Sequence, residues 1–140
     1  MNKVWIAMVL SSVASLSHAT QQAFLIQNSG WMEPFYQDQN SQFKPLINGV
    51  IQTVAKPDDK IVVSVFNQSN ALAKSPKIIY QGAGAKPMLA DLQAQQIAYK
   101  NDKAYADTDF TEAVVSTINE PFAKQSGIIW IFTNNKNSPN

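Results

Sequence analysis

Three short polar segments of this chain carry side chains that could bind a ligand or a metal ion. Residues 27–30 (Gln-Asn-Ser-Gly) follow the apolar run 23–26, and residues 133–135 (Thr-Asn-Asn) follow the apolar run 128–132. Residues 107–109 (Asp-Thr-Asp) precede an amphipathic segment. Hydroxyl and amide groups accept and donate hydrogen bonds, and oxygen ligands suit hard cations. If the runs are strands of one parallel sheet, these segments meet at its carboxyl edge, where such sheets bind ligands.

Ser29 is the residue in these segments that could act as a nucleophile. It lacks the Gly-x-Ser-x-Gly motif, and the chain has a single histidine, His18, to activate it. His18 lies in a leader that we expect to be removed. A Ser-Lys hydrolase would be the remaining enzymatic alternative, but no spacing between Ser29 and a lysine supports it. We therefore expect a protein without catalytic activity.

Residues 1–19 predict a signal peptide. Lys3 supplies a positive end, residues 4–16 are apolar and uncharged, and the segment ends in a small-x-small cleavage site. The run is shorter than the roughly 20 residues that a membrane span needs, so we expect cleavage before Thr20 rather than an uncleaved anchor. Residues 20–140 would then form one exported domain, periplasmic or extracellular, with a signal of bacterial type. Membrane association would require a further C-terminal anchor segment.

The mature chain predicted in this way would contain no cysteine, histidine or arginine. This composition excludes disulfides, histidine-dependent catalytic triads and histidine-ligated zinc. Ten lysines balance ten acidic residues, so the net charge is close to zero. Neutrality and the lack of arginine argue against binding to nucleic acid, which depends on basic side chains.

The remaining sequence alternates between strand-like and helix-like patterns. Continuous apolar runs, typical of strands buried on both faces, lie at residues 23–26, 61–66 and 128–132, and a short antiparallel edge strand is expected at 77–80. Amphipathic periodicity predicts helices over residues 43–54, 87–99 and 110–120, with a loop at 33–41. The alternation predicts an α/β fold with a doubly wound, mainly parallel sheet and helices on both faces.

Local signals refine this picture. In the helix at 43–54, Leu46 and Ile47 are both expected on the apolar face. Asp109, followed by Glu112 three residues later, matches a helix capping box. Asp58 and Asp59 could be a catalytic pair, but their place after Lys56-Pro57 favours a solvated turn between a helix and a strand.

The order and spacing of the polar segments resemble those of a von Willebrand factor type A (vWA) domain, over residues 23–135. A vWA domain opens with a buried strand ending in Asp-x-Ser-x-Ser, and residues 27–31 (Gln-Asn-Ser-Gly-Trp) hold that place. Thr108, with Ala113 five residues later, fits the family's threonine before a helix. Residues 128–135 fit its apolar strand ending in Thr-Asp-Gly. The resemblance implies a Rossmann-like vWA fold.

In the vWA family these residues form a metal-ion-dependent adhesion site, which binds magnesium or manganese through hydroxyl and carboxylate groups. Here Gln27 and Asn134 replace the two aspartates and Trp31 replaces a serine, so only Ser29 and Thr108 keep the family's residue type. Neutral amides compensate poorly for dehydrating a magnesium ion. We expect no cofactor, and a degenerate site in which Gln27, Ser29, Thr108 and Asn134 hydrogen-bond to one another. An adhesion domain that retains magnesium or manganese through Ser29 and Thr108 is the alternative.

The resemblance implies a non-enzymatic protein-binding or adhesion module with an unidentified protein partner. Its ligand-binding face would consist of Gln27, Ser29, Trp31, Thr108 and Asn134. The nearby aromatic residues, from Trp31 to Tyr36, could form a contact surface or could cover the end of the first helix, and both alternatives stay open.

Domains of this family continue beyond the strand that residues 128–132 represent, with helices and two further strands. The resemblance therefore implies that the last strands are missing and that the domain is truncated. Either a longer form of this chain or a strand from another chain would complete the open edge.

Overall fold

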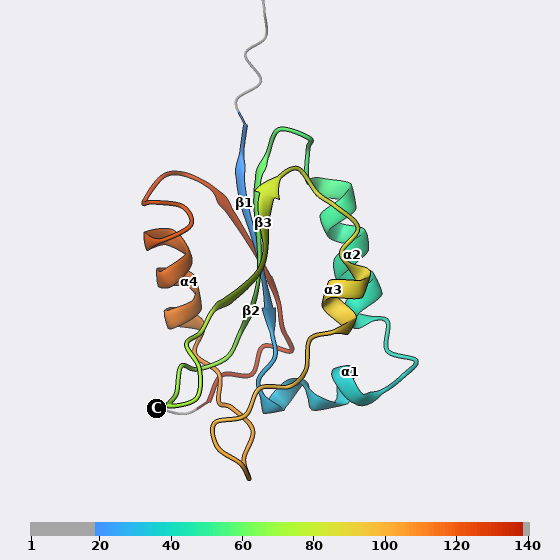
Figure 1. Ribbon diagram of the computed structural model, residues 1–140, viewed down its shortest axis with the longest axis vertical. Helices are drawn as coiled ribbons and strands as arrows, with labels where there is room; N and C mark the ends of the chain where they lie inside the picture. Colours follow the sequence, from blue (N-terminus) through green and yellow to red (C-terminus); the bar gives the residue numbers. More distant parts are fainter. Residues whose placement is uncertain (1–18, 139–140) are drawn as a thin grey trace, which may run out of the picture.

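The computed structural model describes residues 19–138. The predicted signal peptide therefore lies outside the described residues, apart from Ala19. The described chain forms a four-stranded sheet in the order β3-β2-β1-β4, and helices pack on both of its faces (Figure 1). This arrangement confirms the predicted α/β class.

The sheet is parallel except at one edge. Its strands are β1 (Gln21–Gln27), β2 (Lys60–Phe66), β3 (Lys77–Ala83) and β4 (Ile128–Phe132). β1 pairs in parallel with β2 and β4, and β3 pairs antiparallel with β2. Six of the seven residues of both β1 and β2 are buried, as continuous apolar runs require. The predicted antiparallel edge strand is confirmed and is longer than expected, because pairing with β2 extends it to Ala83.

The helices divide between the two faces of the sheet. Figure 1 shows α2 and α3 on one face and α4 on the other. The helices are η1 (Gly30–Met32), α1 (Glu33–Gln37), α2 (Phe43–Val54), α3 (Leu89–Gln93) and α4 (Phe110–Asn119). Among the described residues, no helix combines the length and the apolar character that crossing a bilayer requires.

Helix α2 covers one face of the sheet through a narrow apolar stripe. Ile47 and Ile51 are fully buried and belong to one cluster with Phe24 of β1 and Val63 of β2. Each such side chain contributes about 1.5–3 kcal/mol through burial. The expectation that Leu46 also faces the core is wrong, since 61% of this residue is exposed.

Two further predictions of local structure are wrong. Residues 33–41 contain the short helix α1, in which Pro34 lies in the first turn, where proline is tolerated. The helix expected over residues 87–99 is limited to α3. Beyond it the backbone bonds to other segments, since the amide of Ala98 donates to the carbonyl of Asn28 at 2.8 Å. These long-range hydrogen bonds replace those that a longer helix would have made.

The turn predicted before β2 is confirmed, with Lys56, Pro57 and Asp58 exposed, but the expectation that Asp59 is also solvated is wrong, because this residue is buried. Its carboxylate accepts hydrogen bonds from the amide of Lys56 at 2.9 Å, the amide of Thr20 at 3.0 Å and the side chain of Gln22 at 2.7 Å. The bond from the Lys56 amide is the main reason why the pKa of Asp59 lies below its ordinary value. Trp130 donates to Oε1 of Gln22 at 2.9 Å, so this group joins β1, β4 and the turn before β2.

Candidate functional site

The carboxyl ends of β1 and β4 meet the loop before α4, as the sequence predicted. Gly30, just past β1, permits this close approach, because a Cβ atom there would lie 2.6 Å from the Cβ of Tyr105. The amide of Gly30 donates to the carbonyl of Ala106 at 3.0 Å. The loop is thereby held against β1, and Thr108 is brought beside Ser29.

Gln27, Ser29 and Thr108 form a buried hydrogen-bonded group. The Nε2 atom of Gln27 lies 2.7 Å from Oγ of Ser29 and 2.9 Å from Oγ1 of Thr108. The Thr108 hydroxyl also bonds to the Ser29 hydroxyl at 2.5 Å. No more than 2% of any of the three residues is exposed. Their side chains therefore support the surface from below and do not present groups to a partner.

Thr133, which follows β4, completes this group, which we call the Gln27 cluster (Gln27, Ser29, Thr108 and Thr133). Its hydroxyl donates to Oε1 of Gln27, and the carbonyl oxygen of Lys136 lies 3.2 Å from Nε2 of Gln27. The sequence analysis placed Thr133 in a polar segment at this edge but did not include it among the site residues. It assigned Asn134 to the cluster instead, and the structure corrects this: Asn134 donates to the carbonyl of Trp31 at 2.8 Å.

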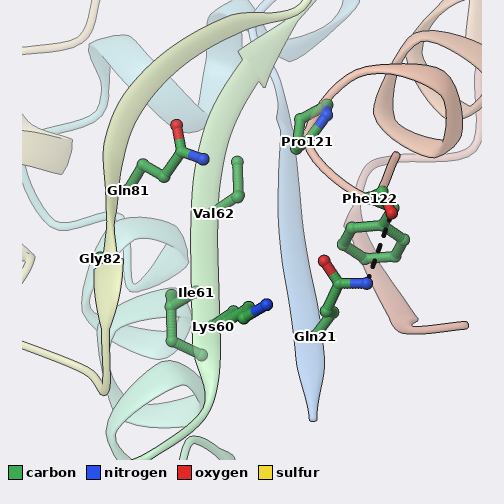
Figure 2. A pocket seen from close by; sticks show the side chains of 8 residues that line it. All are labelled: Gln21, Lys60, Ile61, Val62, Gln81, Gly82, Pro121 and Phe122. Atoms are coloured by element: carbon green, nitrogen blue, oxygen red, sulfur yellow. Dashed lines mark hydrogen bonds between the residues drawn. The ribbon is translucent and has the colours of Figure 1, made fainter. Parts of the chain in front are cut away.

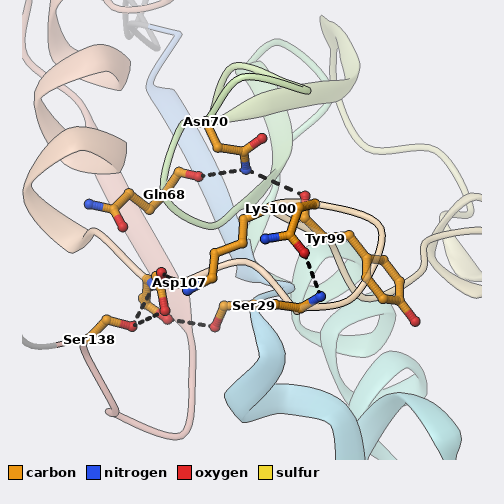
Figure 3. A network of polar contacts seen from close by, with 10 residues as sticks. Ser29, Gln68, Asn70, Tyr99, Lys100, Asp107 and Ser138 are labelled. Atoms are coloured by element: carbon orange, nitrogen blue, oxygen red, sulfur yellow. Dashed lines mark hydrogen bonds and ion pairs between the residues drawn. The ribbon is translucent and has the colours of Figure 1, made fainter.

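The two aspartates beside Thr108 are engaged elsewhere. Oδ1 of Asp109 accepts from the amide of Glu112 at 2.8 Å, which confirms the predicted N-cap of α4. The reciprocal bond of a capping box is replaced, because the Glu112 carboxylate accepts from the amide of Ser69 at 2.8 Å. Asp107 forms an ion pair with Lys100 at 2.6 Å and accepts from Ser138 at 3.4 Å (Figure 3).

This donor set does not fit a hard divalent cation. A cation needs oxygen lone pairs that converge on one point, whereas here the amide hydrogens of Gln27 point at the two hydroxyl oxygens. Across residues 19–138, no three histidine, cysteine, aspartate or glutamate side chains gather closely enough to hold a metal ion. The absence of a bound cofactor stays a prediction.

A second buried amide group lies beside the Gln27 cluster and was missed from the sequence. Nδ2 of Asn67 donates to Oδ1 of Asn28 at 3.0 Å, and Nδ2 of Asn28 donates to the carbonyl of Gln96 at 3.2 Å. Ser75 exchanges hydrogen bonds with the backbone of Asn67, at 2.9 Å and 2.8 Å. Asn28 and Asn67 follow β1 and β2 directly. The ends of the two strands are therefore joined by side chains as well as by the sheet.

The aromatic residues after β1 differ in burial and contacts. Tyr36 is turned inward, donates to the carbonyl of Gln27 at 3.0 Å and packs against Phe43 of α2, and its burial raises the pKa of the phenol. Trp31 and Phe35 remain 46% and 41% exposed. The ammonium group of Lys136 lies 5.1 Å from the centre of the Trp31 ring, within the range of a cation–π contact.

A further hollow lies away from the Gln27 cluster. It has a volume of about 210 Å³ and lies between β1, β2, β3 and the turn after α4 (Figure 2). Its lining is largely apolar, with Val62 and Phe122 prominent, and Lys60 is the only ionisable group that lines it. Gln21 donates to the carbonyl of Phe122 at 3.4 Å on one side. With one ionisable group, this hollow has no pair of residues for acid–base catalysis.

Comparison with known proteins supports the fold. No family model and no curated protein matches the chain. The crystal structure of the ArnB paralog VWA2 from Sulfolobus acidocaldarius is similar, with a TM-score of 0.54 and 14% sequence identity. The match covers 87% of this chain and 29% of that one, so this chain spans less than a third of its length. At this identity the likeness shows the fold alone, which is consistent with a Rossmann-like vWA fold.

Proposed function

We propose that this chain is an exported, non-enzymatic vWA-type module that binds a protein partner through the loops at the carboxyl edge of its sheet, without a metal ion. One observation carries the proposal. In the Gln27 cluster, a neutral amide donates to the two hydroxyl groups that a vWA metal site would direct at its ion. The loops are thereby held in place without a cation.

We divide the predicted ligand-binding face into residues that support the loops and residues that contact the partner. Gln27, Ser29 and Thr108 are buried, so we assign them to positioning the loops. Trp31 is exposed and is held by Asn134 through its carbonyl and by Lys136 through its ring. Exposed tryptophan side chains with a fixed backbone are frequent energetic centres of protein interfaces. We therefore assign the partner contact to Trp31 and Asn134.

Photo-crosslinking in the native host tests this assignment. A benzoyl-phenylalanine in place of Trp31 is expected to yield a discrete crosslinked protein that mass spectrometry identifies. The same residue in place of Gln125, which is exposed at the opposite end of the sheet, is the control and is expected to yield none. Equal crosslinking from both positions, or none from position 31, would remove the proposed contact surface.

The metal-dependent adhesion domain makes the opposite prediction about chelation. If magnesium or manganese completes the partner contact, EDTA abolishes the crosslink at position 31 and manganese restores it. We expect the yield to be unchanged by EDTA, because the amide of Gln27 already bonds to the hydroxyls of Ser29 and Thr108. Loss of the crosslink in EDTA would establish the alternative.

The enzymatic alternative is tested with a serine-reactive phosphonate. A hydrolase would be labelled at Ser29, whereas we expect no labelling, because this side chain is fully buried and bonds only to Gln27 and Thr108 among the described residues.

Export is tested separately, by the intact mass of the native product. We expect a chain that begins at Thr20, and retention of residues 1–19 would contradict an exported, processed protein.

A further inference from the structure

A hollow lies at the carboxyl edge of the sheet, on the flank of β1 that faces β2 and β3. It has a volume of about 360 Å³, which is within the range of small-molecule sites. We call it the Asn67 pocket; its lining includes Asn28, Val65, Asn67, Lys74, Lys77 and Tyr99. Ligands of α/β sheets bind just beyond the carboxyl ends of parallel strands, which is where Asn28 and Asn67 lie after β1 and β2.

Two lysines line the Asn67 pocket, and no carboxylate of the described residues does. Lys77 begins β3 opposite Val65 of β2, and residues opposite each other in an antiparallel pair share a face of the sheet. The ion pairs among residues 19–138 are formed by other lysines, Lys86 and Lys100. Within this part of the chain, Lys74 and Lys77 are therefore not neutralised by a carboxylate.

The other charges close to the Asn67 pocket leave it positive. Lys74 also lines a polar hollow on the α4 face of the sheet, together with Glu112 and Glu120, so its charge is divided between two hollows. A further ammonium group lies beside the pocket, because Nζ of Lys44 donates to the carbonyl of Gln95, a lining residue, at 2.9 Å. A hollow lined by charges of one sign attracts ligands of the opposite sign, so the pocket favours an anion.

The two buried asparagines of the pocket have amide hydrogens that the fold does not use. A carbonyl can only accept, so the carbonyl of Gln96 orients Nδ2 of Asn28 toward itself, at 3.2 Å. Oδ1 of Asn28 is thereby left to accept from Nδ2 of Asn67, at 3.0 Å. Each of these nitrogens carries two hydrogens and has one acceptor among residues 19–138, so one N–H of each side chain remains for a ligand. Only 6% of Asn28 and 8% of Asn67 are exposed, so both donors are held in place.

The loop that carries Lys74 is tied to the segment on the other side of the pocket. Oδ1 of Asn70 accepts from the amide of Ala73 at 3.3 Å. Nδ2 of Asn70 donates to the carbonyl of Gln68 at 3.3 Å and to the carbonyl of Tyr99 at 3.5 Å (Figure 3). These bonds form the pocket before a ligand enters it, which reduces the entropy lost on binding.

We propose that the Asn67 pocket binds a small organic acid, of about the size of an amino acid, through its carboxylate. The ammonium groups of Lys74 and Lys77 supply the opposite charge. The unused amide hydrogens of Asn28 and Asn67 donate to the carboxylate oxygens, and hydrogen bonds to an ionised acceptor are stronger than neutral ones. The carbon skeleton of the acid packs on the apolar part of the lining, including the ring of Tyr99. The binding needs no partner protein, so it is independent of the contact surface proposed above.

An NMR titration of the purified, isotopically labelled chain with succinate tests the proposal, at constant pH and ionic strength. The side-chain amide signals of Asn28 and Asn67 should shift and saturate, with a dissociation constant on the order of 1 mM or lower. Succinamide has the same carbon skeleton without the charges, and it should cause no saturable shift. The side-chain amide of Gln125, which is exposed at the opposite end of the sheet, should not respond to either compound.

Lysine variants show which charges the acid contacts. Lys77→Gln should raise the dissociation constant for succinate at least about tenfold, because a charge-assisted contact is lost. Lys74→Gln should raise it less, since the charge of Lys74 is divided between two hollows. Lys60→Gln is the matched control: Lys60 is an exposed lysine at the amino end of β2, and its loss should leave the affinity unchanged. All three lysines are exposed, and backbone signals away from the pocket establish that each variant is folded.

Three results would overturn the proposal: no saturable shift with succinate, an equal response to succinamide, or an equal loss of affinity in Lys60→Gln and Lys77→Gln. The acidic side chain of a protein is the other source of a carboxylate. A blocked Gly-Asp-Gly peptide represents it, and we expect this peptide to bind more weakly than succinate. Tighter binding of the peptide would contradict the assignment of the pocket to a free acid.

Discussion

The side-chain amide nitrogen of Gln27 lies 2.9 Å from the hydroxyl oxygen of Thr108, a residue 81 positions later in the chain. This bond joins the end of β1 to the loop before α4 in a site from which water is excluded. Buried polar groups of this kind are costly when one partner is removed, since the other loses its hydrogen bond without regaining water. Among residues 19–138, every buried side-chain nitrogen and oxygen has a hydrogen-bond partner. A substitution in the Gln27 cluster is therefore expected to leave a buried polar atom without a partner and to lower the free energy of unfolding.

Replacing Thr108 by valine should destabilise the fold by about 1–3 kcal/mol, because Gln27 and Ser29 lose the hydroxyl while the side-chain volume is kept. Urea unfolding measures the change. Thr111→Val is the matched control at an exposed position of α4, where little change is expected. Equal stability of the two variants would show that the cluster does not support the carboxyl edge.

Replacing Gln27 by aspartate should create a metal site. The shorter carboxylate supplies the negative charge that the cluster lacks, beside the hydroxyls of Ser29 and Thr108. A dissociation constant on the order of 1 mM would add about 1.4 kcal/mol at about 10 mM manganese, which is a rise in Tm of several degrees. Differential scanning calorimetry with and without manganese measures the rise.

The natural chain is the control for this metal experiment, and its Tm should not respond to manganese. The double variant Gln27→Asp with Thr108→Val should respond less than Gln27→Asp alone, because one hydroxyl ligand is removed. Manganese stabilisation of the natural chain would contradict the proposed cation-free edge.

Replacing Asp59 by asparagine should lower stability at neutral pH by about 1–3 kcal/mol, because the carboxylate accepts from two amides and from Gln22. The folded-state pKa of Asp59 lies below its ordinary value, mainly because of the Lys56 amide. The unfolded chain therefore binds this proton at a higher pH, near 3.9 for an ordinary aspartate. The stabilisation is present above about pH 4 and is lost as pH falls through the folded-state pKa.

Urea unfolding between neutral and acidic pH measures this dependence. The curve of the Asp59→Asn variant should be flatter than that of the natural chain below about pH 4. Asp58→Asn is the neighbouring control, since Asp58 is exposed, and it should change stability little at neutral pH. Parallel curves for the natural chain and Asp59→Asn would show that Asp59 does not titrate with unfolding.

Replacing Asp109 by alanine should cost about 1 kcal/mol, because the amide of Glu112 loses its acceptor at the first turn of α4. Asp102→Ala removes an exposed carboxylate from the nearby loop and should change stability little. Thermal unfolding of both variants measures the difference. If Asp102→Ala is the more destabilised of the two, the cap of α4 contributes less than its geometry indicates.

The features that the sequence predicted correctly depend on local patterns. The continuous apolar runs at β1, β2 and β4 identify strands, and the spacing of Ile47 and Ile51 identifies α2. The burial expected from these runs is confirmed for β1 and β2 but is wrong for β4, where Ile128 and Ile131 are exposed and the other three residues are only partly buried. The N-cap at Asp109 follows from residue types three positions apart. These signals depend on backbone geometry, which acts over a few residues and is therefore visible in the sequence.

Other features were decided by contacts between distant segments. Residues 94–99 leave the predicted helix because the backbone of Ala98 bonds to Asn28. Asp59 is buried because Thr20 and Gln22 of another segment donate to it. Leu46 belongs to an apolar pattern, but 61% of this residue is exposed in the folded chain. Local propensities do not predict these features, since each contact partner lies many residues away along the chain.

The sequence by itself determined the fold class and the three polar segments. Tertiary structure decided which side chains meet at the carboxyl edge: Thr133 and not Asn134 joins Gln27, and the side chain of Asn134 bonds to the carbonyl of Trp31. Whether an amide faces inward or outward depends on which distant hydroxyl lies within about 3 Å of it. Such distances are set by the packing of the whole sheet edge, so the sequence alone does not predict them.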